Sequence, residues 1–289
     1  MKIRTQNLFI AFLLIVACAG SAYSQKPATA VLRAFEPTED LIYDAEFSRA
    51  LLRKVDIADL RLSASRPSLL HKVLDESAKV PDKLVLTCSV SSKGFFAKLF
   101  GLRFRETLES IVDPVSLSVE NSKRVDEQGK RLRSSEAIFD TARGKVSWTE
   151  RDPGDAGRAP RVVNADFSGQ VHDILSAIYF LRTQPLTVGK SMELSISDSG
   201  QVYQVPIRVL ERKRLKTVVG RVDALLLEAD LFGIRGMLEG EGKFFIWLTD
   251  DVRRIPVAVK IKSEYGTFDI RLKKISATPS DQPYLSKQD

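Results

Sequence analysis

The sequence predicts a mainly β protein, with an antiparallel curved sheet that forms a half-barrel or barrel and one central covering helix at about residues 169–183. Two observations support this fold class. After residue 38 the chain alternates apolar and polar residues in roughly ten to thirteen short segments at hairpin-like spacing. Only residues 166–192 place apolar residues at a clear helical spacing. A single helix among many strands is expected to bury the apolar face of the sheet.

The chain of 289 residues is long enough for one large all-β domain. We expect a signal peptide at residues 1–24, a tether at 25–37, a single all-β domain with one main helix at 38–276, and a flexible tail at 277–289. The excess of Lys and Arg over Asp and Glu gives a net charge of +7, which is too small to indicate a nucleic-acid partner. Such a charge is compatible with a membrane surface, lipopolysaccharide or acidic glycans.

The first residues have the pattern of an export signal. Lys2 and Arg4 precede an apolar run from Leu8 to Ala19, and residues 22–24 form an A-x-S cleavage motif. The apolar run is short for a transmembrane helix. The sequence therefore predicts a periplasmic protein that begins at Gln25.

A second interpretation of the leader places its end before Cys18. Residues 15–18, I-V-A-C, resemble a bacterial lipobox, in which the cysteine is lipidated and attaches the protein to the outer membrane. We favour cleavage after Ser24, because lipoboxes usually carry Leu where Ile15 stands. In both interpretations the chain is exported from the cytoplasm.

After cleavage at Ser24, Cys88 is the only cysteine, so an intramolecular disulfide is excluded. Cys88 shares one face of a predicted strand with Leu84, Leu86 and Val90. This pattern indicates a buried, unreactive thiol rather than a nucleophile.

The alternating pattern places the strands in the following order: Leu41–Phe47, Ile57–Ser63, Leu84–Val90, Phe104–Val112, Val115–Val119, Leu132–Asp140, Lys145–Thr149, Met192–Ile196, Tyr203–Val209, Val218–Ala229, Phe244–Leu248, Val257–Ile261 and Phe268–Leu272. The charge run Lys123–Arg131 is interpreted as a solvated hairpin tip. Arg151–Arg161 is interpreted as a long loop that separates the N-terminal strands from the helix. Pro206 indicates an edge strand.

The predicted helix carries both end signals. Ser168 offers an N-cap oxygen, Asp173 places negative charge in the first turn, and Arg182 places positive charge in the last turn. Pro185 and Gly189 then end the helix. Its apolar stripe comprises Val171, Ile174, Leu175, Ile178 and Leu181.

A phenylalanine-rich segment stands out between two predicted strands, flanked by Lys and Arg. One interpretation is an amphipathic loop that contacts a membrane or gates a lipid pocket. The other, which we favour, is a turn of helix packed on the sheet, since about ten residues are short for an interfacial anchor. The candidate ligand or membrane contacts are Phe95, Phe96, Leu99, Phe100 and Leu102.

Catalytic patterns are sparse. His71 and His172 are the only histidines, and His172 is expected at the surface or as a capping residue. The G-x-S-x-G elbow is absent. Asp250 and Asp251 are better explained by an Asx-type turn than by calcium, which needs several spaced oxygens. The sequence therefore predicts no catalytic residue, no metal site and no cofactor.

A wider set of residues resembles a known family. The set is Asp173-x-x-Ser-x-x-Tyr-x-x-Arg182, Leu186-x-x-Gly189, the run Ile246–Asp251 with Arg254 and Pro256, and Leu41-x-Tyr43. It resembles an exported bacterial family known only as domain of unknown function 3108, over roughly residues 36–275. The resemblance implies an exported β protein, loosely similar to lipoprotein-carrier half-barrels, and it implies no activity.

Three hypotheses for function follow. The first is a non-enzymatic envelope protein whose curved sheet binds a lipid, another apolar ligand or a membrane component. The second is a structural or protein-interaction module of the envelope with a solid core. A hydrolase that uses Asp173 or the Asp250–Asp251 pair is a minor third, because no recognised motif supports it.

Overall fold

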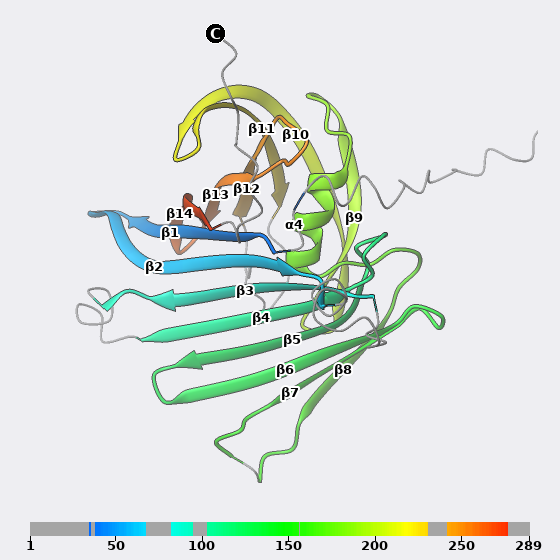
Figure 1. Ribbon diagram of the computed structural model, residues 1–289. Coiled ribbons are helices and arrows are strands. Elements are labelled where there is room, and N and C mark those ends of the chain that lie inside the picture. The colour runs from blue at the N-terminus through cyan, green and yellow to red at the C-terminus, as the bar shows by residue number, and fades with distance from the viewer. Residues whose placement is uncertain are drawn as a thin grey trace, which may run out of the picture.

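The structure is a computed structural model, and it describes residues 35, 38–67, 82–94, 103–155, 157–230 and 242–276. These residues form one antiparallel sheet of 14 strands and one helix, α4 (Ile174–Thr183). The sheet is open and curls around α4 (Figure 1). The predicted fold class is therefore confirmed.

The strands follow one another along the chain with these bounds: β1 (Asp40–Arg49), β2 (Leu52–Ser65), β3 (Leu84–Ser92), β4 (Phe104–Val112), β5 (Val119–Gln128), β6 (Arg131–Asp140), β7 (Lys145–Arg151), β8 (Arg161–Asp166), β9 (Ser191–Asp198), β10 (Gln201–Thr217), β11 (Gly220–Asp230), β12 (Gly242–Thr249), β13 (Pro256–Ser263) and β14 (Gly266–Ser276).

The order of the strands in the sheet divides it into two wings. It runs β8-β7-β6-β5-β4-β3-β2-β1-β14-β13-β12-β11-β10-β9, so every neighbouring pair except β1 and β14 is also consecutive in the chain. The pairing of β1 with β14 joins the N-terminal wing to the C-terminal wing. Curling then brings the two edge strands, β8 and β9, to the same side of the molecule as α4 (Figure 1).

The two edges nearly close against each other. The backbone of His172 bridges to β9, with the His172 N–H donating to the Ser195 carbonyl over 2.9 Å. At the β9–β10 turn, Gly200 has φ +79°, and a Cβ there would lie 2.8 Å from the Cβ of Trp148 and 2.9 Å from that of Val163. Only glycine fits this contact, because any side chain would push the turn away from β7 and β8.

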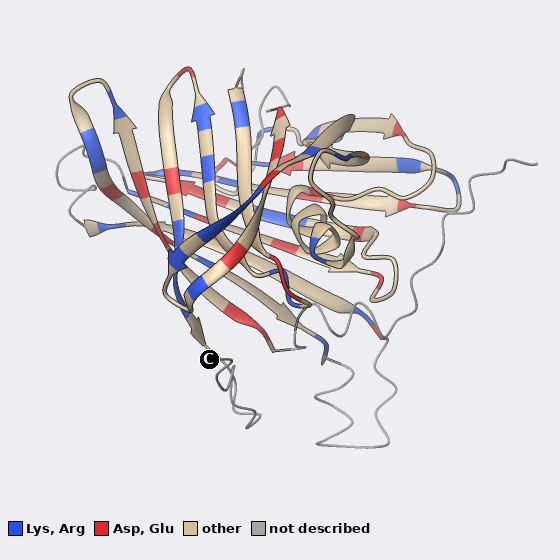
Figure 2. Cartoon of the chain, turned by 90° about the horizontal axis from the view of Figure 1, so that it is seen from above, with Lys and Arg blue, Asp and Glu red and all other residues tan. Residues whose placement is uncertain are grey.

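The core lies on both sides of α4. Leu175 and Tyr179 pack with the inner residues of β1–β7, and Ala177 and Leu181 pack with those of β9–β12. Figure 2, in which the helix is seen nearly end-on, shows the sheet wrapped around it. The predicted covering role of the helix is confirmed.

The N-cap of α4 is Asp173 rather than Ser168. The Asp173 carboxylate accepts a hydrogen bond from the Ser176 N–H over 2.7 Å, and the Ser176 hydroxyl accepts one from the Asp173 N–H over 2.9 Å. This capping box starts the helix at Ile174. The prediction of a start near residue 169 was wrong because the backbone of His172 bonds to β9 and the carbonyl of Val171 accepts from Val119 of β5.

Several strand predictions need correction. The charge run extends as strand β5 to Gln128, because its side chains form ion pairs with neighbouring strands, such as Lys123 with Glu136 at 3.8 Å. Residues 114–116 are a turn rather than a strand. The Arg151–Arg161 loop joins β7 to β8, a strand that the alternating pattern did not reveal.

The edge-strand prediction for β10 was wrong for the strand as a whole. β10 pairs with β9 on one side and with β11 on the other. Pairing with β11 begins only at Arg208, so within the described ranges no strand residue pairs with Pro206 on that side. The missing N–H of proline is tolerated there because, as at the edge of a sheet, it removes no hydrogen bond to a neighbouring strand.

Candidate functional site

The concave face of the sheet changes from apolar to charged across the N-terminal wing. One row of directly paired, inward-facing residues runs Leu62, Cys88, Leu108, Arg124 and Ser135 across β2 to β6. In antiparallel pairs, residues directly opposite each other share a face. The change therefore falls between β4 and β5.

Three ion pairs form what we call the charged wall. Glu106 and Arg124 lie 2.8 Å apart, Asp126 and Arg131 lie 3.5 Å apart, and Arg133 pairs with Asp152. Burial raises the pKa of Glu106, and the neighbouring Arg124 opposes that rise. Each cation of the wall has a carboxylate partner, and Figure 2 likewise shows both signs of charge interspersed along the strands.

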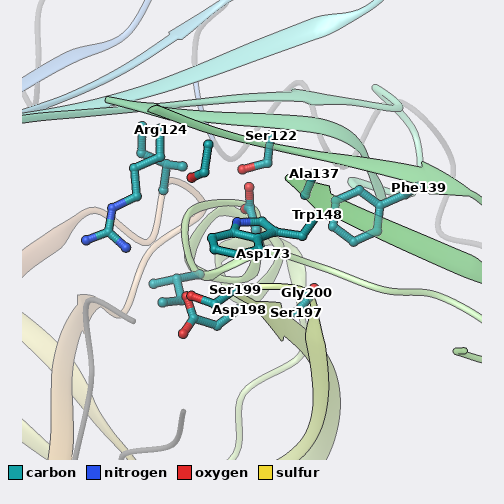
Figure 3. Close-up of a pocket in the computed structure, with 13 residues that line it drawn as sticks. Ser122, Arg124, Ala137, Phe139, Trp148, Asp173, Ser197, Asp198, Ser199 and Gly200 are labelled. Carbon is teal, nitrogen blue, oxygen red and sulfur yellow. The ribbon is translucent and has the colours of Figure 1, made fainter. Parts of the chain in front are cut away.

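A pocket of about 50 Å³ lies between the N-terminal wing, the start of α4 and the β9–β10 turn (Figure 3). Trp148, Asp173 and Arg124 are among the side chains that line it (Figure 3). Its volume is sufficient for roughly three or four water molecules. An acyl chain does not fit. Its lining residues are Leu108, Ser122, Arg124, Ser135, Ala137, Phe139, Trp148, Asp173, Ile174, Ser197, Asp198, Ser199 and Gly200.

One of the two carboxylates that line this pocket, Asp173, is already engaged by the fold. Asp173 caps α4 through Ser176 and also accepts a hydrogen bond from the Ser110 hydroxyl of β4. His172 does not line the pocket. Among the described residues that line the pocket, no imidazole therefore stands beside Asp173 to complete a nucleophile–base pair.

His172 is buried, so its prediction as a surface or capping residue was wrong. Its Nδ1 lies 2.9 Å from the Leu117 carbonyl oxygen, and its ring lies 4.5 Å from that of Phe180. Burial lowers the pKa of His172 from 6.5 to about 4, against smaller opposing effects of the Leu117 carbonyl and Asp173. The imidazole is a packed, neutral part of the core.

A second feature of the concave face lies at the end of the sheet away from α4, and we call it the apolar row. It consists of five half-buried side chains that pair directly across five strands. These are Val55 of β2, Phe47 of β1, Phe268 of β14, Ile261 of β13 and Phe244 of β12.

Each strand places its member of the apolar row on the concave side by alternation. Phe47 lies two residues from the buried Ala45, and Phe244 lies two residues from the buried Ile246. Since successive side chains of a strand point to opposite faces, both phenylalanines share the face of the core. The rings of Phe47 and Phe268 are 5.0 Å apart. The row thus extends the buried core outwards as a partly exposed apolar surface.

The C-terminal end of α4 is anchored by a fully buried ion pair. The Arg182 guanidinium donates to both carboxylate oxygens of Glu39, over 2.5 and 2.8 Å, and both side chains have zero exposure. The guanidinium also lies 5.1 Å from the centre of the Tyr179 ring and 5.2 Å from that of Phe35. The predicted positive charge in the last turn is therefore a structural anchor.

The structure tests only some of the predicted site residues. Phe95, Phe96, Leu99, Phe100, Leu102, His71 and the lipidation candidate Cys18 lie outside the described residues. Cys88 is buried as predicted, and burial raises its pKa to about 12. The predicted Asx turn is present, because Asp251 accepts from the N–H groups of Arg253 and Arg254.

Two kinds of feature are absent from the described residues, a cluster of metal-binding side chains and a helix able to span a bilayer. No group of three or more His, Cys, Asp or Glu side chains among them is arranged to hold a metal ion. No helix within the described ranges is both long and apolar enough to span a bilayer.

Sequence reasoning missed the apolar row, the charged wall and Glu39. The alternation of each strand does show which residues share a face, so the members of the apolar row carried a local signal. Their alignment depends on the register between β1 and β14, which are separated by most of the chain. Glu39 lies 143 residues from Arg182 and looks like an ordinary surface acid.

A family model described as "Protein of unknown function (DUF3108)" matches residues 73–273. The chain belongs to the DUF3108 family. No curated protein matches this DUF3108 chain. The match to the family model confirms the resemblance to this family that the motif set indicated.

One solved structure shows the same type of fold. A beta-barrel-like protein of domain of unknown function DUF1849 from Brucella abortus has a TM-score of 0.52 and 10% identity, with 82% of this chain and 96% of that chain covered. At this identity the likeness shows the fold alone. A DUF1089 family protein from Pseudomonas aeruginosa has a TM-score of 0.33 and 12% identity, covering 73% and 92%. Hypothetical protein CT021 from Chlamydia trachomatis has a TM-score of 0.33 and 9% identity, covering 89% and 96%.

Proposed function

We propose that this DUF3108 protein is an exported, non-enzymatic envelope protein that binds a lipid or another apolar ligand along the apolar row. The observation that carries the proposal is the row itself. Phe47, Phe268 and Phe244 leave part of their rings uncovered on the concave face, next to the core. An acyl chain laid along the row removes this apolar surface from water, which is favourable at about 25 cal/mol per Å².

The neighbouring charged residues favour an amphipathic ligand over a pure hydrocarbon. At the same end of the sheet, the inward face of the N-terminal wing carries Phe104 of β4, which pairs with Gln128 of β5, and Gln128 in turn pairs with Arg131 of β6. A ligand lying on the apolar row therefore has polar donors within the same concave face. A lipid with its chain on the row and its head group towards β5 and β6 fits both surfaces.

The non-enzymatic part of the proposal rests on the pocket. One of its two carboxylates, Asp173, serves as the cap of α4, and the nearby His172 is packed against Phe180 outside the pocket lining. A general base must reach the proton that it removes, and the described lining offers no histidine beside its two carboxylates and its serines.

Export is supported by the leader sequence. Lys2, Arg4 and the apolar run up to Ala19 fit a secretory signal, and Cys18 offers lipid attachment to the outer membrane. An envelope address also suits the ligand, since lipids and lipopolysaccharide are the abundant amphipathic molecules there.

One observation favours the alternative function, a structural or protein-interaction module. Around α4 the inner residues of both wings form packed clusters, and the pocket beside them holds only about 50 Å³. A closed ligand cavity is therefore a poorer proposal than an open surface. In this alternative, the apolar row contacts another envelope protein.

Native mass spectrometry of the protein purified from a bacterial envelope, with a denaturing run alongside, tests the proposal. We expect an added mass that disappears on denaturation and is identified as a lipid. A mass of the protein alone would contradict lipid binding and favour the interaction module. The denaturing run also shows whether the chain begins at Gln25 or at a lipidated Cys18.

A further inference from the structure

The turn between β1 and β2 exposes two leucines in succession. Leu51 is 98% exposed and Leu52 is 38% exposed. A single exposed leucine is ordinary on a protein surface. Two adjacent leucines at the tip of a hairpin form a larger apolar surface, and none of the functions considered so far uses it.

A second hairpin adds to this surface. The β13–β14 turn carries Tyr265, which is 54% exposed. This turn packs beside the β1–β2 turn, since a Cβ on Gly266 would lie 2.7 Å from the Phe47 ring and 2.7 Å from the Ser48 carbonyl oxygen. Three exposed apolar side chains therefore stand on two adjacent turns, which we call the hairpin tips (residues 49–54 and 262–266).

The charge of the hairpin tips is strongly unbalanced. They contain Arg49, Arg53, Lys54 and Lys262, all exposed, against the single carboxylate of Glu264. Within the described part of the chain, none of these four cations forms an ion pair. This contrasts with the charged wall, in which each cation has a carboxylate partner.

The hairpin tips also lie at the same end of the sheet as the apolar row, where the ligand is proposed to bind. The β1–β2 turn stands at the outer end of its hairpin, away from α4 (Figure 1). Phe47 and Phe268 of the apolar row lie directly behind it, because Ser48 pairs with Thr267 and Phe47 pairs with Phe268.

We propose that the hairpin tips dock this protein on an anionic lipid bilayer. Leu51, Leu52 and Tyr265 enter the interface between head groups and acyl chains, while the cations contact lipid phosphates. Docking at the hairpin tips places the apolar row next to the bilayer surface. The inference therefore deepens the proposed function, and it rests on that function for the claim that a lipid binds to the row.

A bilayer suits this surface better than a folded partner. The exposed apolar side chains stand on two hairpin turns, and such narrow elements match a soft surface that closes around them. The four cations need a dense supply of negative charge, and anionic head groups supply it without a defined geometry.

Vesicle flotation tests the docking surface, with a Cys18→Ser background so that no lipid attached at Cys18 holds the protein. The vesicles contain equal parts of phosphatidylethanolamine and phosphatidylglycerol, and phosphatidylcholine vesicles serve for comparison. We expect binding to the anionic vesicles. Combined Leu51→Ser and Leu52→Ser should weaken it about tenfold or more. Arg49→Gln with Arg53→Gln should weaken it by roughly fivefold per charge.

The matched control is Val252→Ser, which removes a side chain 72% exposed in the β12–β13 turn. This variant should bind like the wild type, and all variants should keep the wild-type melting temperature. Failure of the wild type to bind anionic vesicles would overturn the proposal. So would unchanged binding by the leucine variant, or a partner protein whose binding depends on the two leucines without vesicles.

The two proposals fail separately. Loss of vesicle binding in the leucine variant, with the lipid mass in native mass spectrometry retained, supports docking by the tips and ligand binding elsewhere. A lipid mass without vesicle binding overturns the docking surface alone. Leucine-dependent vesicle binding without any lipid mass overturns the proposed function and leaves the docking surface standing.

Discussion

Arg182 and Glu39 form the most completely buried ion pair of the described chain, with zero exposure of either side chain. Burying two charges is costly, and their mutual attraction offsets that cost only while both remain. The pair therefore fixes the helix to the start of β1 and makes each partner dependent on the other. Because 143 residues separate the two partners, the pair could not be recognised from the sequence.

We expect Glu39→Gln to lower the free energy of unfolding by about 3–5 kcal/mol, because Arg182 is left buried without its counter-ion. Combining Glu39→Leu with Arg182→Met should cost less than Glu39→Gln alone. The control is the adjacent Asp40→Asn, which breaks an exposed pair with Arg61 and should cost less than about 1 kcal/mol. Urea unfolding measures all three, and an equal effect of the two adjacent changes would contradict the anchor.

His172 makes stability depend on pH. Its pKa is about 4 in the folded protein and 6.5 when unfolded, so between these values the unfolded state binds more protons. Its contribution to stability is complete above pH 6.5 and is lost as the pH falls towards 4. The wild type should lose about 2 kcal/mol more than a His172→Gln variant between pH 8 and pH 5. Equal losses in urea unfolding would mean that the imidazole titrates normally.

Residue-level predictions from the sequence were correct where the local pattern decides burial. Cys88 lies on an apolar strand face, so alternation alone placed it in the core. Burial of His172 and Arg182 depends on Phe180, Leu117 and Glu39 as partners. Polar residues of this kind are not recognised as buried until their partners are known.

At the scale of the elements, the start of α4 separates local signal from tertiary structure. Ser168 and Asp173 both suit an N-cap, and the sequence alone favoured the earlier one. The structure uses Asp173 because the His172 backbone bonds to β9. Tertiary pairing thus shortened a helix whose end at Thr183 was predicted correctly.

Replacing Asp173 and Ser168 by alanine, one at a time, tests which of them is the N-cap of α4. Asp173→Ala should cost more than about 1–2 kcal/mol, since it removes the cap and also leaves the buried Ser110 hydroxyl without its acceptor. Ser168 is exposed, and Ser168→Ala should change the free energy of unfolding by less than about 0.5 kcal/mol. The reverse order of the two effects in urea unfolding would restore the earlier start of the helix.

Strand β5 shows why charge patterns misled the prediction. Its residues from Lys123 to Gln128 read as a solvated tip, yet both faces carry ion pairs to β4 and β6, such as Arg124 with Glu106 at 2.8 Å. Cross-strand pairs of opposite charge stabilise a sheet. A strand built in this way has no apolar alternation for a sequence to reveal.

At the scale of the whole molecule, the fold class followed from alternation and the single helix, while the closure of the sheet did not. The order of strands depends on the pairing of β1 with β14, and the near-closure depends on contacts of Gly200 with β7 and β8. Both join segments that are distant in the chain. The apolar row exists only through this order, so the candidate ligand site was beyond prediction from the sequence.

The proposed function treats the molecule as a half-barrel with a filled end and an open end. α4 and the pocket, which Arg124 of the charged wall lines, lie at the filled end, and among the described residues the apolar row and the hairpin tips lie towards the other end. A ligand surface beside a docking surface gives a lipid a short path between bilayer and protein. This arrangement makes the apolar row the central claim.

The most direct test compares two neighbouring phenylalanines of β12 by native mass spectrometry. Phe244 belongs to the apolar row, whereas Phe245 lies on the opposite face under Lys262, 5.3 Å from its ring centre. Both are half-buried. We expect Phe244→Ser to reduce the lipid-bound fraction about tenfold and Phe245→Ser to leave it unchanged. Equal retention in both variants, or equal loss, would contradict a ligand site on the concave face.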